Sequence, residues 1–90
     1  MKHSFGMAVE VEKDTGEILS VYLQIRGGKS AETREVDPGR VFVDYNSAGE
    51  LLGIEMLAPS KIRVLDTITQ NEPETQRFVN RSVPREMAIA

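Results

Sequence analysis

The segment RVFVDYNSAGELLGIEML, residues 40–57, decides the fold because it holds two alternating apolar runs joined by a turn. Apolar side chains occupy every second position of both runs: Val41, Val43 and Tyr45, then Leu52, Ile54 and Met56. A period of two residues is typical of a strand with one buried face. The Asn-Ser-Ala-Gly sequence between the runs, residues 46–49, favours a hairpin turn. Gly53 indicates a bulge or a close approach of other atoms to the backbone.

The same segment also has the spacing of an EF-hand calcium loop, with Asp44, Asn46 and Glu55 as candidate ligands and Gly49 at the glycine position. Ala48 offers no side-chain oxygen where such a loop has a ligand, and the flanking residues predict strands rather than helices. We therefore expect the first two residues to serve the turn and Glu55 to face solvent from a strand. Calcium binding at this acidic hairpin, residues 44–55, stays open as the alternative.

Two further alternating runs precede this hairpin. Residues 7–13 place Met and Val on one face and Glu on the other, and residues 17–26 alternate in the same way. The Asp-Thr-Gly at 14–16 predicts a turn between them. Residues 31–36 are mostly charged, so we expect either an edge strand, which charges protect from unwanted pairing, or an extended loop. The Asp-Pro-Gly that follows is a strong turn signal.

After Pro59 the period changes to that of a helix. Ser60 is a candidate N-cap, and apolar residues follow at helical spacing over 62–68. A second short helix should begin at Asn71 or Glu72, with Pro73 in its first turn.

Taken together, these patterns predict an α+β fold: an antiparallel β-meander of about five strands with two short C-terminal helices. We expect a single domain over residues 1–90, with a β-sheet core over 7–58 and a helical extension over 59–90. The apolar face of one sheet must be covered. We expect residues 61–83 to cover part of it and a second copy to cover the rest, which predicts a homodimer.

The segment EVDPGRVFVDYNSAGELLGIEMLAPSK, residues 35–61, resembles the core motif of a known family. The residues that carry the resemblance are Val43, Asp44, Tyr45, Gly49, Leu52, Gly53, Ile54, Glu55, Leu57, Ala58 and Ser60. Upstream, VYLQIRGGKSAETREV, residues 21–36, is similar to the tyrosine-containing strand, Gly/Lys turn and Glu-rich segment of the same family. The chain therefore resembles domain of unknown function family 2283, a set of short, mostly prokaryotic proteins, over roughly residues 7–61.

The resemblance implies a small antiparallel β domain with no established activity and no catalytic residue to carry over. Members are often encoded beside small toxins, which implies an antitoxin-like role with a small protein partner. Ala48 departs from the family, whose members often have an acidic residue at this position. This difference weakens the hypothesis that residues 44–55 bind a metal ion.

Composition excludes several chemistries. The chain has no cysteine, which removes disulfides, thiolate metal sites and cysteine nucleophiles, and fits a reducing cytoplasm. A net charge of −3 and only five aromatic residues argue against direct nucleic-acid binding. No run of about 18 apolar residues exists, so we expect no membrane span. The first residues also lack the apolar stretch of a signal peptide. We expect a cytoplasmic protein.

The sequence offers little support for any catalytic residue. His3 is the single histidine, and we expect it to lie in a disordered terminus. Arg26–Ser30, Arg-Gly-Gly-Lys-Ser, lacks the full phosphate-loop spacing and should be a turn. Paired acids without a pocket favour a solvated face. We therefore predict a non-enzymatic protein–protein interaction module that self-associates and needs no cofactor, with no catalytic residues and no metal ligand beyond the candidates above.

Overall fold

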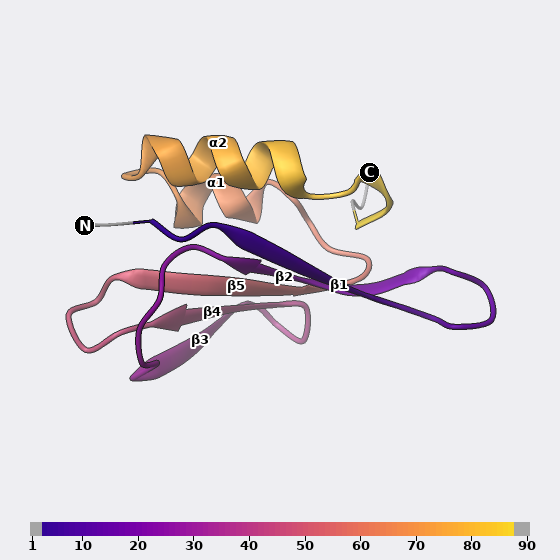
Figure 1. Ribbon diagram of the computed structural model, residues 1–90, viewed down its shortest axis with the longest axis horizontal. Helices are drawn as coiled ribbons and strands as arrows, with labels where there is room; N and C mark the ends of the chain where they lie inside the picture. Colours follow the sequence, from indigo (N-terminus) through magenta and orange to yellow (C-terminus); the bar gives the residue numbers. More distant parts are fainter. Residues whose placement is uncertain (1–2, 88–90) are drawn as a thin grey trace.

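One antiparallel sheet of five strands forms the base of the molecule, and the helices lie together on one of its faces (Figure 1). The computed structural model describes residues 3–87. The strands are β1 (Gly6–Val11), β2 (Ile18–Gln24), β3 (Glu32–Asp37), β4 (Val41–Tyr45) and β5 (Leu51–Leu57). The helices are α1 (Val64–Ile68), α2 (Pro73–Ser82) and the short 3-10 helix η1 (Arg85–Met87). The predicted α+β fold, a five-stranded antiparallel sheet with two short C-terminal helices, is confirmed.

The strand order corrects one part of the prediction. An uninterrupted meander would pair neighbours in sequence, whereas the observed order is β1-β2-β5-β4-β3. Burial explains the difference. Strand β5 is buried at nearly every position, so its most favourable place is the centre of the sheet. Strand β3 is exposed over its first four residues and carries charges at most positions, so it lies at an edge, where charges also discourage pairing with other chains.

The hairpin β4–β5 forms as predicted except at its turn end, where a register shift pairs Tyr45 with Leu51, and Leu51 rather than Leu52 joins the core cluster. Val43 pairs with Ile54 and Val41 with Met56, and all four side chains are fully buried on the face that the helices cover. Gly49 ends the connecting turn with φ +81°, a conformation that glycine adopts without steric cost.

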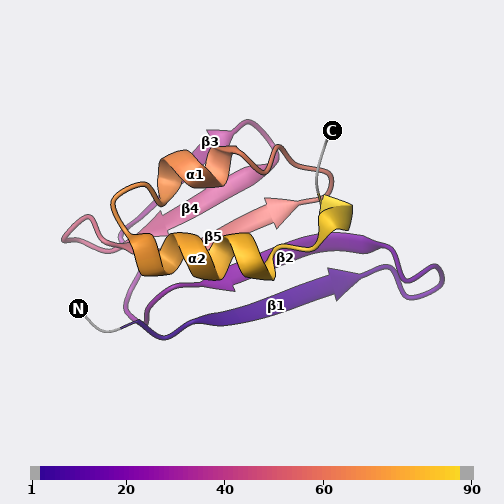
Figure 2. The same cartoon turned by 90° about the horizontal axis from the view of Figure 1, so that it is seen from above.

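The helices close the core from one side. Figure 2 shows α2 above β2 and β5, and α1 above β4. Leu65 of α1, Val79 of α2 and Met87 of η1 are fully buried against the sheet residues. The segment after Pro59 therefore packs on its own sheet. No helix within residues 3–87 is long and apolar enough to cross a membrane.

The first helix begins later than predicted. Ser60 is not an N-cap: α1 starts at Val64, and no side chain in the described part of the chain caps it. Ser60 is fully buried, its hydroxyl donates to the Leu57 carbonyl, and its N–H donates to the Met87 carbonyl at 2.7 Å. The residue thus joins the end of β5 to η1. The second helix agrees with the prediction, since Glu72 is its N-cap residue and Pro73 its first residue.

Candidate functional site

The residues predicted to bind calcium lie on one hairpin but make different contacts. Asp44 pairs with Gly53, and Phe42 pairs with Glu55, so the two carboxylates occupy diagonal positions on neighbouring strands. Such diagonal positions are about 7–8 Å apart. The Asn46 side-chain oxygen accepts hydrogen bonds from the N–H groups of Ala48 (3.0 Å) and Glu50 (2.9 Å), so it serves the turn. Within residues 3–87, no three His, Asp or Glu side chains form a group that could hold a metal ion.

Asp44 instead takes part in a polar contact on the sheet face opposite the helices. The Thr33 hydroxyl donates to its carboxylate at 2.6 Å and the Tyr22 hydroxyl at 3.4 Å. Tyr22 reaches Asp44 by lying over Gly53 of the strand between them, where an added Cβ would lie 2.5 Å from the Tyr22 Cζ. Partial burial, and then the nearby Asp44 carboxylate, raise the pKa of Tyr22 above its usual value. The close approach predicted at Gly53 is thus the approach of a tyrosine ring.

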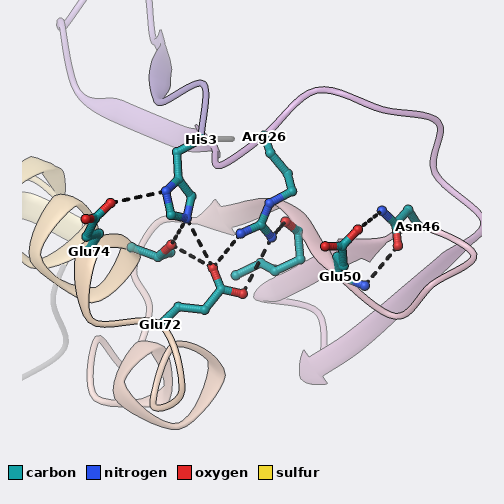
Figure 3. Close-up of polar contacts among 8 residues, drawn as sticks. His3, Arg26, Asn46, Glu50, Glu72 and Glu74 are labelled. Atoms are coloured by element: carbon teal, nitrogen blue, oxygen red, sulfur yellow. Dashed lines mark hydrogen bonds and ion pairs between the residues drawn. The ribbon is translucent and has the colours of Figure 1, made fainter. Parts of the chain in front are cut away.

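A second polar group joins the sheet to α2, and most of it was missed by sequence reasoning (Figure 3). Arg26 follows β2 and is 6% exposed. Its guanidinium donates to the Leu51 carbonyl at 2.5 Å and to the Glu72 carboxylate at 2.8 Å. Its Nε is buried without a partner among the described residues. Since a buried charge is costly unless paired, Arg26 and Glu72 together fix the start of α2 over the sheet.

Glu72 is the centre of this polar group. Besides Arg26, it accepts a hydrogen bond from the Thr75 hydroxyl at 2.8 Å. Partial burial raises the pKa of Glu72, but the hydrogen bonds from Arg26 and Thr75 and the charge of Arg26 outweigh burial, so this pKa lies below its usual value. The carboxylate therefore stays ionised, as the buried guanidinium requires.

His3 is ordered against this group, which corrects the expectation of a disordered terminal residue. Its Nε2 lies 3.6 Å from Glu72 and its Nδ1 lies 3.3 Å from Glu74. Its ring stacks on Phe5, which stacks on Phe78 of α2, with centroid distances of 4.8 and 4.5 Å. No local pattern could reveal these contacts, because the partners are about 70 residues apart in the chain.

The polar group borders an open cleft of about 550 Å³. Its lining includes His3, Arg26, Glu72 and Glu74, and Arg77 adds a further cation. Each nitrogen of His3 faces a different carboxylate, and Arg26 is already engaged. Charges of both signs are therefore largely matched within the group, which suits holding the N-terminal segment and α2 together.

The main apolar feature outside the core lies along β1 and the adjoining part of β2. We call it the apolar stripe, and it comprises Phe5, Met7, Val9, Val11 and Leu19, each between 38% and 49% exposed. Met7 pairs with Leu23 and Val9 with Val21, so the stripe is on the face that carries the helices. The helices stand over the centre of the sheet and leave most of this margin uncovered, although Phe5 at its start stacks on Phe78 of α2 (Figure 2). The predicted inward face of β1 is thus only half covered by the chain itself.

Comparison with known proteins gives one match. A family model described as Protein of unknown function (DUF2283) matches residues 16–60, which is half of the 90-residue chain. The matched part runs from the β1–β2 turn through β5 and includes the Tyr22, Asp44 and Gly53 contact. No curated protein and no solved structure matches the chain.

Proposed function

Because the chain belongs to the family of proteins of unknown function DUF2283, no activity comes with its identity, and we propose a function from its own surface. We propose that it is a non-enzymatic protein–protein interaction module that self-associates as a homodimer in the cytoplasm. The observation that carries this proposal is the apolar stripe. Single exposed apolar residues are ordinary on a protein surface, but a contiguous group of large ones marks an interaction site.

The composition of the stripe supports association in water. All five side chains are apolar, and none carries a group that water would stabilise strongly. Full burial of such a side chain contributes about 1.5–3 kcal/mol, so covering the half that is still exposed contributes about 1 kcal/mol for each. A chain of this length also buries a smaller fraction of its surface than a larger domain does, and association adds to its core.

Light scattering on the wild-type protein tests the proposal. We expect twice the chain mass of 10.0 kDa at micromolar concentration. Val9→Lys places a charge at the centre of the stripe and should give a folded monomer. Ala31→Lys is the matched control, because it adds the same charge at an exposed position beside β3, on the opposite edge of the sheet. It should remain dimeric.

A wild-type monomer throughout the micromolar range would contradict the proposal. So would a dimer that Val9→Lys leaves intact, since the stripe would then not be its interface. Circular dichroism of each variant separates loss of association from loss of folding.

A further inference from the structure

The two edges of the sheet differ in how well they are protected. Strand β3 forms one edge with exposed Glu32, Arg34 and Glu35 and an irregularity before Asp37. Charges and bulges are the usual means by which an edge avoids pairing with another chain. Strand β1 forms the other edge (Figure 2). Its sequence, GMAVEV, has one internal charge and stripe residues at alternate positions. The unprotected edge and the apolar stripe therefore coincide.

The hydrogen-bonding groups of β1 are divided between its two sides. The Ser4 N–H donates to the Ile25 carbonyl and the Glu12 N–H to the Glu17 carbonyl. Because backbone groups alternate in direction along a strand, even-numbered residues of β1 face β2. The N–H and C=O groups of Met7 and Val9 then face the free edge. These two residues also belong to the stripe. Within residues 3–87, the side chains and the backbone groups that lack partners are therefore on the same residues.

From these features, and resting on the proposed self-association, we propose that two copies join edge to edge through β1. The two β1 strands run antiparallel across a two-fold axis at Ala8, and two five-stranded sheets become one of ten strands. In this arrangement Met7 pairs with Val9 of the second copy, and Phe5 pairs with Val11. The two stripes lie side by side between the two α2 helices.

The register follows from comparing the possible two-fold axes. In an antiparallel pair of strands, the side chains of opposite residues point to the same face of the sheet. The two-fold axis must therefore place one residue opposite its own copy, and it cannot lie midway between two residues. An axis at Glu10 sets two carboxylates directly opposite each other, which is destabilising. An axis at Val9 sets Phe5 opposite Lys13, and an axis at Met7 sets Val11 opposite His3. An axis at Ala8 pairs the stripe residues of β1 only with one another and sets Glu10 opposite Gly6, which leaves room for its side chain.

Edge pairing also suits the position of the helices. Both helices stand on the same face as the stripe, so the stripe lies on a margin beside α2 (Figures 1 and 2). A second sheet laid flat on this margin would have to fit beside two helices. Side-by-side pairing avoids them and satisfies the free backbone groups as well.

A cysteine crosslink tests the register directly, since the chain has no cysteine of its own. At the axis, Ala8 and its mate form a pair without direct hydrogen bonds, with Cα atoms about 4.5 Å apart. This separation is within the range that a disulfide spans, about 4.4–6.8 Å. Ala8→Cys should therefore become a covalent dimer on mild oxidation. Ser20→Cys, one strand further in, is the control and should stay uncrosslinked.

Hydrogen exchange on the wild-type protein gives a second readout that needs no substitution. Amides of Met7 and Val9 should exchange more than about tenfold more slowly at concentrations that favour the dimer than in dilute solution. If light scattering shows a dimer but Ala8→Cys does not crosslink and these amides stay unprotected, the edge pairing is overturned while the proposed function stands. A monomer by light scattering overturns both.

Discussion

Gly53 is the position where a small change should have the clearest structural effect. In Gly53→Ala, the new Cβ would overlap the Tyr22 hydroxyl, lie 2.5 Å from the Tyr22 Cζ and lie 3.2 Å from the Leu23 carbonyl oxygen. The tyrosine ring can swing away, but the carbonyl belongs to the neighbouring strand and cannot move without disturbing the sheet. The substitution must therefore displace the ring from β5 and break its contact with Asp44.

Two effects of opposite sign set the magnitude. Replacing Gly by Ala in a strand normally stabilises by about 0.5–1 kcal/mol, because the unfolded chain loses conformational freedom. Overpacking costs about 1–3 kcal/mol. We therefore expect a net loss of about 1–2 kcal/mol in the free energy of unfolding. For a domain of this size each kcal/mol lowers the melting temperature by about 4–8 °C.

Urea unfolding of four proteins measures this effect: wild type, Gly53→Ala, Tyr22→Ala and the double variant. Once Tyr22 is removed the ring no longer opposes the new methyl group, so Gly53→Ala should be close to neutral in that background. The coupling free energy between the two positions should then be at least about 1 kcal/mol. A wild-type background that tolerates Gly53→Ala without loss, or an equal loss in both backgrounds, would refute the reasoning.

Two further predictions concern the polar residues. Glu72→Gln removes the charge that faces buried Arg26 and should lower the free energy of unfolding by about 1–3 kcal/mol at neutral pH, measured in urea. Because the folded protein holds the pKa of Glu72 below its usual value of 4.5, its stabilisation is present above that pH and is lost as the pH falls further. Melting curves of Glu72→Gln should therefore depend less steeply on pH below about 4.5, and identical acid slopes would contradict this. In a calcium titration followed by amide chemical shifts, we expect no saturable change at Asp44, Asn46 or Glu55 up to millimolar calcium, because the Asn46 oxygen is engaged in the turn. Saturable shifts confined to those three residues would support the metal alternative instead.

Sequence alone could predict the local elements because each rests on contacts between residues near one another in the chain. The alternation over residues 40–57 specifies two strands and their buried faces, and Gly49 specifies the turn. Pro73 specifies the start of α2. The charged residues 31–36 allowed an edge strand or a loop, and the structure shows the edge strand β3.

Much less of the candidate site could be predicted from the sequence. Arg26 looked like part of a turn; the chain bends there, but the guanidinium is buried against a residue 46 positions away. His3 had no partner in its own segment, and its contacts are on α2. Such pairs have no fixed spacing in sequence, so no periodic pattern of residues indicates them. They exist because the helices fold back over the sheet and bring charges together that must then be paired.

The sequence by itself determined which side of each strand is apolar, since a period of two residues assigns faces. It could not determine which strands are neighbours, because face assignment is the same for every order of strands. Only the tertiary structure placed β5 at the centre, where its apolar residues are buried, and left β1 at an edge. That placement turns the apolar face of residues 7–11, an ordinary core pattern in sequence, into a half-exposed stripe along a free edge of the sheet that the described residues form. The surface on which the proposed function depends therefore results from strand order, which is set by the total burial of the whole chain.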